Sequence, residues 1–91
     1  MAALSVKDKI KAGAKIIDVR SAAEFADESY PGAINIPLNL LPAKMDSLGP
    51  KDQSIVLHCA SGARSAQAAR LLKQAGFTDV VNAGGLSDMP R

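Results

Sequence analysis

Reactive and aromatic residues are scarce in this chain of 91 residues. It contains one cysteine, no tryptophan, one tyrosine and two phenylalanines. A single cysteine excludes an internal disulfide, and one cysteine with one histidine cannot complete a zinc site without other ligands. We therefore expect no metal. So few aromatic side chains also leave little surface on which nucleic-acid bases could stack.

Neither charge nor hydrophobicity is concentrated in one part of the chain. Eleven Lys and Arg are scattered among nine Asp and Glu, for a net charge of +2, so we expect no nucleic-acid partner. The longest uncharged stretch, residues 29–43, carries three prolines and is too short to span a membrane, so no membrane partner is expected. With 47% apolar and 22% charged residues, the chain is expected to form one globular domain over residues 1–91.

The beginning of the chain bears on its compartment. It shows neither the basic region nor the apolar region of a signal peptide, which predicts a cytoplasmic protein as the sequence stands. A periplasmic protein is expected instead if Met1 stands where a signal peptide was removed. We also expect a monomer.

Short apolar runs alternate with segments of helical character. Four strands are predicted, at residues 14–19, 33–36, 54–58 and 80–82. Four helices are predicted: one that begins at Ser5 and ends at Gly13, one from Ser21 to Asp27, one that Asn39 caps and that ends before Gly49, and an Ala-rich one over residues 63–75. Alternation at this spacing predicts right-handed crossovers and a mainly parallel sheet.

Two carboxylates near the first predicted strand have structural explanations. Asp18 lies at the end of that strand, and Glu24 completes a Ser-x-x-Glu capping box that Ser21 opens. A pair of catalytic carboxylates is therefore not needed to explain them. The double glycine Gly84-Gly85 predicts a turn after the last strand.

The only cysteine lies between a predicted strand and the longest predicted helix. Residues 59–65 read C-A-S-G-A-R-S, and the four small residues between Cys59 and Arg64 allow the backbone to curl with its N–H groups inward. Ligands bind at the carboxyl ends of parallel strands, and the amino end of a helix favours a thiolate. We therefore predict a reactive Cys59 within an anion-binding loop. The alternative is a small buried hydrophobic residue.

The neighbours of this cysteine leave several alternatives open. Arg64 is expected to face an anion, since a cation in the first turn opposes the helix dipole, although a surface position also explains it. Ser61 and Ser65 either donate hydrogen bonds to a bound anion or cap the helix. Arg20 either adds positive potential at the same sheet edge or is a solvated surface residue. His58 is interpreted as a packed or partly exposed histidine rather than a general base.

Four segments in order carry a resemblance to a known family. They are I-I-D-V-R-S-A-A-E-F at residues 16–25, P-G-A-I-N-I-P at 31–37, C-A-S-G-A-R-S at 59–65 and N-A-G-G-L at 82–86. Together they resemble a single-domain rhodanese (thiosulfate sulfurtransferase), and the ending N-A-G-G-L-S-D-M-P is especially similar to the small stress-induced rhodaneses of the bacterial periplasm. The resemblance implies an α/β fold of three layers, with a central, mainly parallel sheet of four to five strands flanked by helices.

The resemblance also implies a chemistry. Cys59 would carry a covalent persulfide and need no cofactor. Its substrate-binding residues would be the loop that follows, namely Ala60, Ser61, Gly62, Ala63, Arg64 and Ser65. The partners would be a small anionic sulfur donor such as thiosulfate and a thiophilic acceptor such as cyanide, a thiol or a protein cysteine, with ping-pong kinetics.

Two other functions remain open. Phosphatases and arsenate reductases of related fold place five residues between cysteine and arginine, whereas this chain places four. A non-catalytic sulfur-carrier or interaction module is the other, although such modules commonly lose the cysteine. The chain also departs from the family where Glu28-Ser29-Tyr30 replaces the usual Gly-His-Ile, and in lacking a tryptophan after the double glycine. We accordingly expect a short or missing terminal helix.

Overall fold

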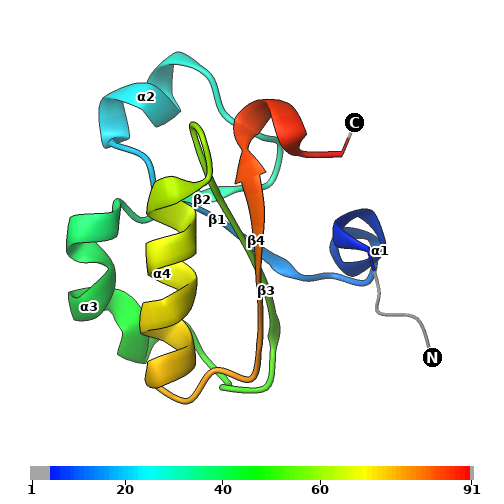
Figure 1. Ribbon diagram of the computed structural model, residues 1–91, viewed down its shortest axis with the longest axis vertical. Coiled ribbons are helices and arrows are strands. Elements are labelled where there is room, and N and C mark those ends of the chain that lie inside the picture. The colour runs from blue at the N-terminus through cyan, green and yellow to red at the C-terminus, as the bar shows by residue number, and fades with distance from the viewer. Residues whose placement is uncertain (1–4, 91) are drawn as a thin grey trace.

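A four-stranded parallel sheet forms the centre of the computed structural model, which describes residues 5–90 (Figure 1). The strand order is β2-β1-β3-β4, with β1 at Lys15–Asp18, β2 at Ile34–Asn35, β3 at Ser54–Cys59 and β4 at Asp79–Gly85. Each neighbouring pair runs parallel, so β1 and β3 are the two inner strands. The predicted α/β class and the parallel sheet are confirmed.

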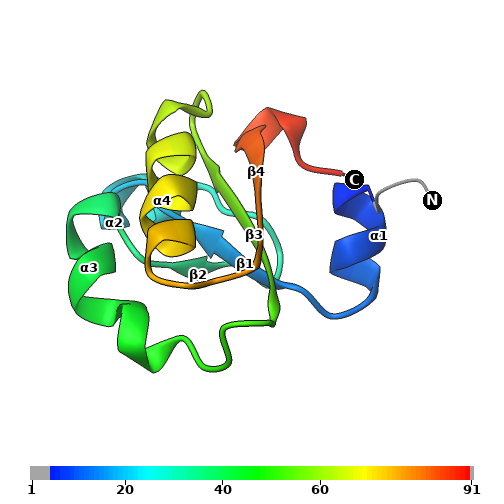
Figure 2. The same cartoon turned by 60° about the horizontal axis from the view of Figure 1, so that its bottom comes forward.

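Helices cover both faces of the sheet and make three layers. The helices are α1 at Val6–Lys11, α2 at Ala22–Asp27, α3 at Leu41–Lys44 and α4 at Ala63–Gln74. Three turns of 3₁₀-helix occur at Leu38–Leu40, Met45–Ser47 and Leu86–Asp88. In Figures 1 and 2, α3 and α4 lie on one side of the sheet and α1 lies on the other. None of the helices in residues 5–90 is long and apolar enough to cross a membrane.

Strand β3 explains the near-continuous apolar run of the sequence, because both of its faces are covered. Ile55, Leu57 and Cys59 belong to the larger core cluster, together with Leu72 of α4. Val56 belongs to a second, smaller cluster on the other face, which also contacts α1. A chain of this size therefore buries apolar side chains on two sides of one thin sheet.

Local signals place α1 and α2 as predicted. The amide of Asp8 donates to Ser5 Oγ at 3.1 Å at the start of α1. At the start of α2 the capping box is complete: Glu24 N donates to Ser21 Oγ at 3.2 Å, and Ser21 N donates to Glu24 Oε1 at 3.0 Å. These contacts satisfy amides that the first turn of a helix leaves without an intrahelical partner.

Two expectations for the other elements are wrong. The single helix capped by Asn39 is wrong: Asn39 lies inside a 3₁₀ turn, and α3 is a short helix between two such turns. Pro42, the second residue of α3, has no N–H to donate, and no side chain caps this segment. The double glycine is the end of β4 rather than a separate turn. After β4 the described chain has only the 3₁₀ turn Leu86–Asp88, which agrees with the expected short or missing terminal helix. The expectation about Met1 concerns a residue outside the described residues.

Candidate active site

Cys59 ends β3, and the loop after it leads directly into α4. Gly62 is the residue before the helix and has φ +99°, a left-handed conformation that side chains other than glycine rarely adopt. A Cβ added at Gly62 would also come within 3.3 Å of Gly84 Cα in β4. The glycine in the loop therefore allows both the turn and its close approach to the neighbouring strand.

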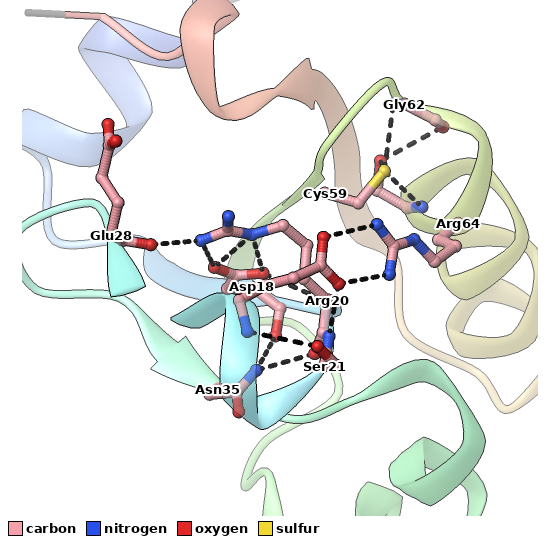
Figure 3. A network of polar contacts seen from close by, with 10 residues as sticks. Asp18, Arg20, Ser21, Glu28, Asn35, Cys59, Gly62 and Arg64 are labelled. Carbon is pink, nitrogen blue, oxygen red and sulfur yellow. Dashed lines mark hydrogen bonds and ion pairs between the residues drawn. The ribbon is translucent and has the colours of Figure 1, made fainter. Parts of the chain in front are cut away.

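The loop folds back onto the cysteine sulfur (Figure 3). Gly62 N donates to Cys59 Sγ at 3.0 Å, and Ser65 N lies 3.4 Å from the same sulfur. The hydroxyl of Ser65 is also 3.4 Å from it. The backbone N–H groups thus point inward, as the spacing of small residues predicts.

Ionisation of the thiol is favoured by these donors. Burial alone would raise the pKa of Cys59, but hydrogen bonds from the Ser65 hydroxyl and from the amides of Ser65, Ser61 and Gly62 outweigh it and lower the pKa from 9.0 to about 7. The thiolate is therefore accessible at neutral pH. The residue is fully buried, so the sulfur lies beneath the loop rather than on the surface.

The remaining loop residues do not contact the sulfur through their side chains. Ala60, Ser61 and Ala63 are exposed, and of these three only Ser61 stabilises the thiolate, through its backbone amide. Neither Ser61 nor any other side chain caps α4, so that alternative for the two serines is wrong. Ser65 lies inside the helix, fully buried, with its hydroxyl directed at the sulfur and at polar groups of β4.

Asn82 of β4 holds the cysteine loop in place by hydrogen bonds, a role that was not predicted from the sequence. Its Oδ1 lies 2.6 Å from the Ser65 hydroxyl, whose single proton can point either to this oxygen or to the Cys59 sulfur, and it accepts from Gly84 N at 2.9 Å. Its Nδ2 donates to Gly62 O at 3.1 Å. The motif N-A-G-G-L contains this asparagine, but nothing local to the motif reveals its partners. Its partners Ser65 and Gly62 lie 17 and 20 residues earlier in the chain.

The end of β4 and the cysteine loop are packed backbone against backbone. A Cβ added at Gly85 would lie 2.2 Å from Ala60 O, a distance that no side chain tolerates. The pairing of β3 with β4 shifts register between Leu57 and Cys59, so that Cys59 pairs with Gly85. Gly85 is therefore required by contact rather than by its own dihedral angles.

Arg64 is held by a carboxylate of α2. Arg64 Nη1 donates to Glu24 Oε1 at 2.8 Å and Nη2 donates to Oε2 at 3.1 Å (Figure 3). This bidentate pair raises the pKa of Arg64 and, together with the Ser21 backbone hydrogen bond, lowers the pKa of Glu24 to about 2. A thiolate at Cys59 also raises the pKa of Arg64, because the negative sulfur attracts the positive guanidinium. The anion that Arg64 faces in this structure is Glu24.

Arg20 is buried, with only 7% of its surface exposed, so the alternative of a solvated surface arginine is wrong. Its Nε and Nη2 donate to the fully buried Asp18 at 2.7 to 3.0 Å, and Nη2 also donates to Glu28 O. The hydrogen bond with Asp18 raises the pKa of Arg20. This pairing favours a structural role, and substrate binding by Arg20 stays a prediction.

His58 is packed rather than partly exposed, the two positions that the sequence left open. It is fully buried, its ring makes an edge contact with Tyr30, and its Nε2 lies 3.9 Å from Asp18 Oδ2. Burial lowers the pKa of His58, an effect larger than the opposing attraction of Asp18. Neither ring nitrogen has a hydrogen-bond partner among residues 5–90, and the same residues contain no group of three His, Cys, Asp or Glu that could hold a metal.

A groove of about 610 Å³ lies beside the ion pair of α2 and α4. Its lining includes Arg64 and Gln67 of α4, Ser21, and several apolar residues, namely Val19, Pro37, Leu38, Pro42 and Leu71. It offers open space next to Arg64 at the carboxyl end of β1. Small molecules that approach Arg64 have room on this side.

Comparisons with known proteins agree with this geometry. Residues 2–89 match the family profile described as Rhodanese-like domain. A sulfurtransferase of Allochromatium vinosum is 41% identical over 70 residues, which cover 77% of this chain and 64% of that protein. The thiosulfate sulfurtransferase PspE of Escherichia coli is 39% identical over 74 residues, which cover 80% of this chain and 71% of that protein.

Solved structures point to the same fold. A rhodanese with anions from E. coli superimposes with a TM-score of 0.79 at 37% identity, covering 86% of this chain and 95% of that one. The chain belongs to the rhodanese-like domain family. Its resemblance to small single-domain rhodaneses is confirmed, and the names of its relatives support a sulfurtransferase.

Proposed function

We propose that this chain moves sulfane sulfur from thiosulfate, or a similar anionic donor, to a thiophilic acceptor through a persulfide on Cys59. The observation that carries the proposal is the convergence of loop amides on a thiol whose pKa is lowered to about 7. A thiolate is the nucleophilic form of cysteine. One of the amides that stabilise it is that of Gly62, the loop glycine with the left-handed conformation.

The first half-reaction conserves atoms and charge. The Cys59 thiolate attacks the outer sulfur of thiosulfate, a sulfur–sulfur bond forms, and the bond to the sulfonate sulfur breaks. Sulfite leaves with the electron pair of that bond, and Cys59 keeps a persulfide anion. The N–H groups that stabilise the thiolate then stabilise the negative terminal sulfur, as preorganised donors do in an oxyanion hole.

The second half-reaction returns the enzyme to its starting state. Cyanide, or a thiolate of a small molecule or protein, attacks the terminal sulfur, and the bond between the two sulfurs of the persulfide breaks. With cyanide the products are thiocyanate and the Cys59 thiolate. No metal or further cofactor takes part in either step, and Arg64 is the cation beside the site that a donor anion would approach.

The names of the relatives support this choice of donor. PspE is named a thiosulfate sulfurtransferase, and the E. coli rhodanese structure is described as containing anions. A human relative is named a thiosulfate:glutathione sulfurtransferase and is 36% identical over 85 residues, which agrees with a thiol as acceptor. We propose these partners for this chain on that basis.

A steady-state assay with thiosulfate and cyanide tests the proposal. We expect thiocyanate and sulfite to form in equal amounts, with parallel double-reciprocal plots, because the two substrates react in separate steps. The Cys59→Ser variant should form neither product while keeping the circular dichroism of the folded chain. Turnover of an aryl phosphate without any thiocyanate would instead support the phosphatase alternative.

A further inference from the structure

Four charged side chains of alternating sign lie near the carboxyl end of β1. Asp18 and Arg20 form a buried pair, and Glu24 and Arg64 form a second, half-exposed pair. Each pair influences the other, since Glu24 raises the pKa of Arg20 while Arg64 lowers it. The two positive charges are thus fully balanced by two negative charges.

Glu24 is fixed in place from two directions. Its Oε1 accepts from Ser21 N within the capping box and from Arg64 Nη1, and its Oε2 accepts from Arg64 Nη2. Bidentate geometry of this kind gives a well-defined pair rather than a loose surface contact. Of the two arginines, Arg20 is buried against Asp18, so Arg64 is the one that borders open space beside the site.

The pair decides what charge an approaching donor meets. Arg64 alone would give this side of the cysteine loop a net positive charge, and the Glu24 carboxylate cancels it. A site built for the tightest capture of a dianion would leave the arginine unpaired, because a carboxylate next to it repels the same anion that the guanidinium attracts.

We propose that Glu24 is a specificity-determining residue: by neutralising Arg64 it disfavours doubly charged sulfur donors relative to singly charged ones. The inference deepens the proposed function and rests on it for the identity of the substrates. Glu24 does not touch the reacting sulfur, and it acts through the charge and position of Arg64. The low pKa of Glu24 keeps the carboxylate ionised throughout the neutral and mildly acidic range.

Two alkylating reagents, one negatively charged and one neutral, test this without any sulfur transfer. The same thiolate attacks the iodine-bearing carbon of iodoacetate or of iodoacetamide and displaces iodide. The two reagents differ in one negative charge, so the ratio of their rate constants cancels changes in the pKa of Cys59. Glu24→Gln removes the charge and keeps the capping box, since glutamine also serves at this position. We expect the ratio of iodoacetate to iodoacetamide to rise about threefold to tenfold, as for a unit charge several Å away in a water-rich medium.

Two further variants fix the sign of the effect. Arg64→Gln leaves Glu24 uncompensated, so the ratio should fall below that of the unmodified chain. The double variant Glu24→Gln with Arg64→Gln is neutral again, and its ratio should return to about the original value. Asp27→Asn, an exposed carboxylate on the same helix, is the matched control and should leave the ratio within twofold. All differences should shrink at high salt.

The same variants separate this inference from the proposed function. In Glu24→Gln the KM for thiosulfate should fall by about threefold or more, and by less for a singly charged thiosulfonate donor. An unchanged alkylation ratio in Glu24→Gln would overturn the inference even if thiosulfate is turned over normally. If the alkylation ratios of the variants change as expected but thiosulfate is not turned over, the result would support Glu24 as the specificity-determining residue and contradict only the choice of donor.

Discussion

The acidity of one thiol determines what this molecule can do, and it results from a competition. Burial opposes the charged form of Cys59, while the Ser65 hydroxyl and three backbone amides favour it. Because these hydrogen bonds outweigh the effect of burial on the pKa, the thiolate is available near neutral pH. An ordinary cysteine with a pKa near 9.0 would be almost entirely a thiol there.

The pH dependence of alkylation tests this balance. The thiolate is the reactive form, so the rate with uncharged iodoacetamide should fall as pH drops through about 7 and level off above it. Ser65→Ala removes the largest stabilising hydrogen bond and should move the midpoint up by about 1 pH unit. Ser87→Ala, at an exposed position, is the control. A midpoint near 9 in the unmodified chain would contradict the account.

Residues whose roles depend on their neighbours in the chain could be predicted from the sequence. Cys59 and its loop could be predicted because a strand end, four small residues and a helix start are adjacent in the chain. Asn82 could not be predicted, since its contacts with Gly62 and Ser65 depend on how β4 packs beside the loop. The burial of Arg20 could not be predicted either, because no pattern near Arg20 in the sequence shows that it and Asp18 are both buried in the fold.

At the scale of single elements, α2 is short and depends on its cap. It has six residues, none of them fully buried, so the Ser21–Glu24 capping box contributes much of what holds it. Ser21→Ala should lower the free energy of unfolding by about 1 kcal/mol, measured by urea denaturation. Ser29→Ala removes a hydroxyl at an exposed position outside any helix and should change it by less than about 0.5 kcal/mol. Equal losses in the two variants would argue against the cap.

The contact between β4 and the cysteine loop is a second test at this scale. In Gly85→Ala the new methyl group would overlap Ala60 O, so the loop must move away from β4. We expect a loss of about 1–3 kcal/mol in unfolding free energy and a higher pH midpoint for alkylation of Cys59.

Gly32→Ala is the matched control for this substitution. Unlike Gly85, Gly32 has a positive φ, and it has open space around the added methyl and lies far along the chain from Cys59. It should cost about 1 kcal/mol of stability through backbone strain alone and leave the alkylation midpoint where it was. A normal midpoint in Gly85→Ala would show that the loop does not depend on this contact.

The elements that were predicted well carry strong local signals, and the others do not. Ser21 with Glu24 marks the start of α2 without help from the rest of the fold. The segment after β2 offered Asn39 as a cap, but apolar residues on both sides, Leu38 and Leu41, pack toward the core and set the 3₁₀ turns instead. Tertiary packing overrode a weak local preference.

At the scale of the whole molecule, stability comes from two thin cores on opposite faces of one sheet. Leu72 of α4 is fully buried against the larger cluster, whereas Leu40 is 45% exposed. Leu72→Ala should therefore cost about 2–5 kcal/mol in unfolding free energy, a large share for a domain of this size. Leu40→Ala should cost well under half of that. Similar losses at both positions would contradict this division of the core.

The parallel sheet followed from the alternation of elements, because parallel strands joined by helices have few alternative arrangements, whereas the strand order was not predicted. The order of the strands brings Cys59 beside β4 and Arg64 beside α2, and these long-range neighbours complete the site. They were inaccessible to motif reasoning for the same reason: each joins segments that are separated along the chain by other elements.

Intact mass measurement after incubation with thiosulfate tests the central claim most directly. The account predicts that the chain gains the mass of one sulfur atom, that cyanide removes it, and that Cys59→Ser never acquires it. A folded chain that shows no gain in mass, or a gain that persists in Cys59→Ser, would contradict the claim that the loop over Cys59 holds a transferable sulfur.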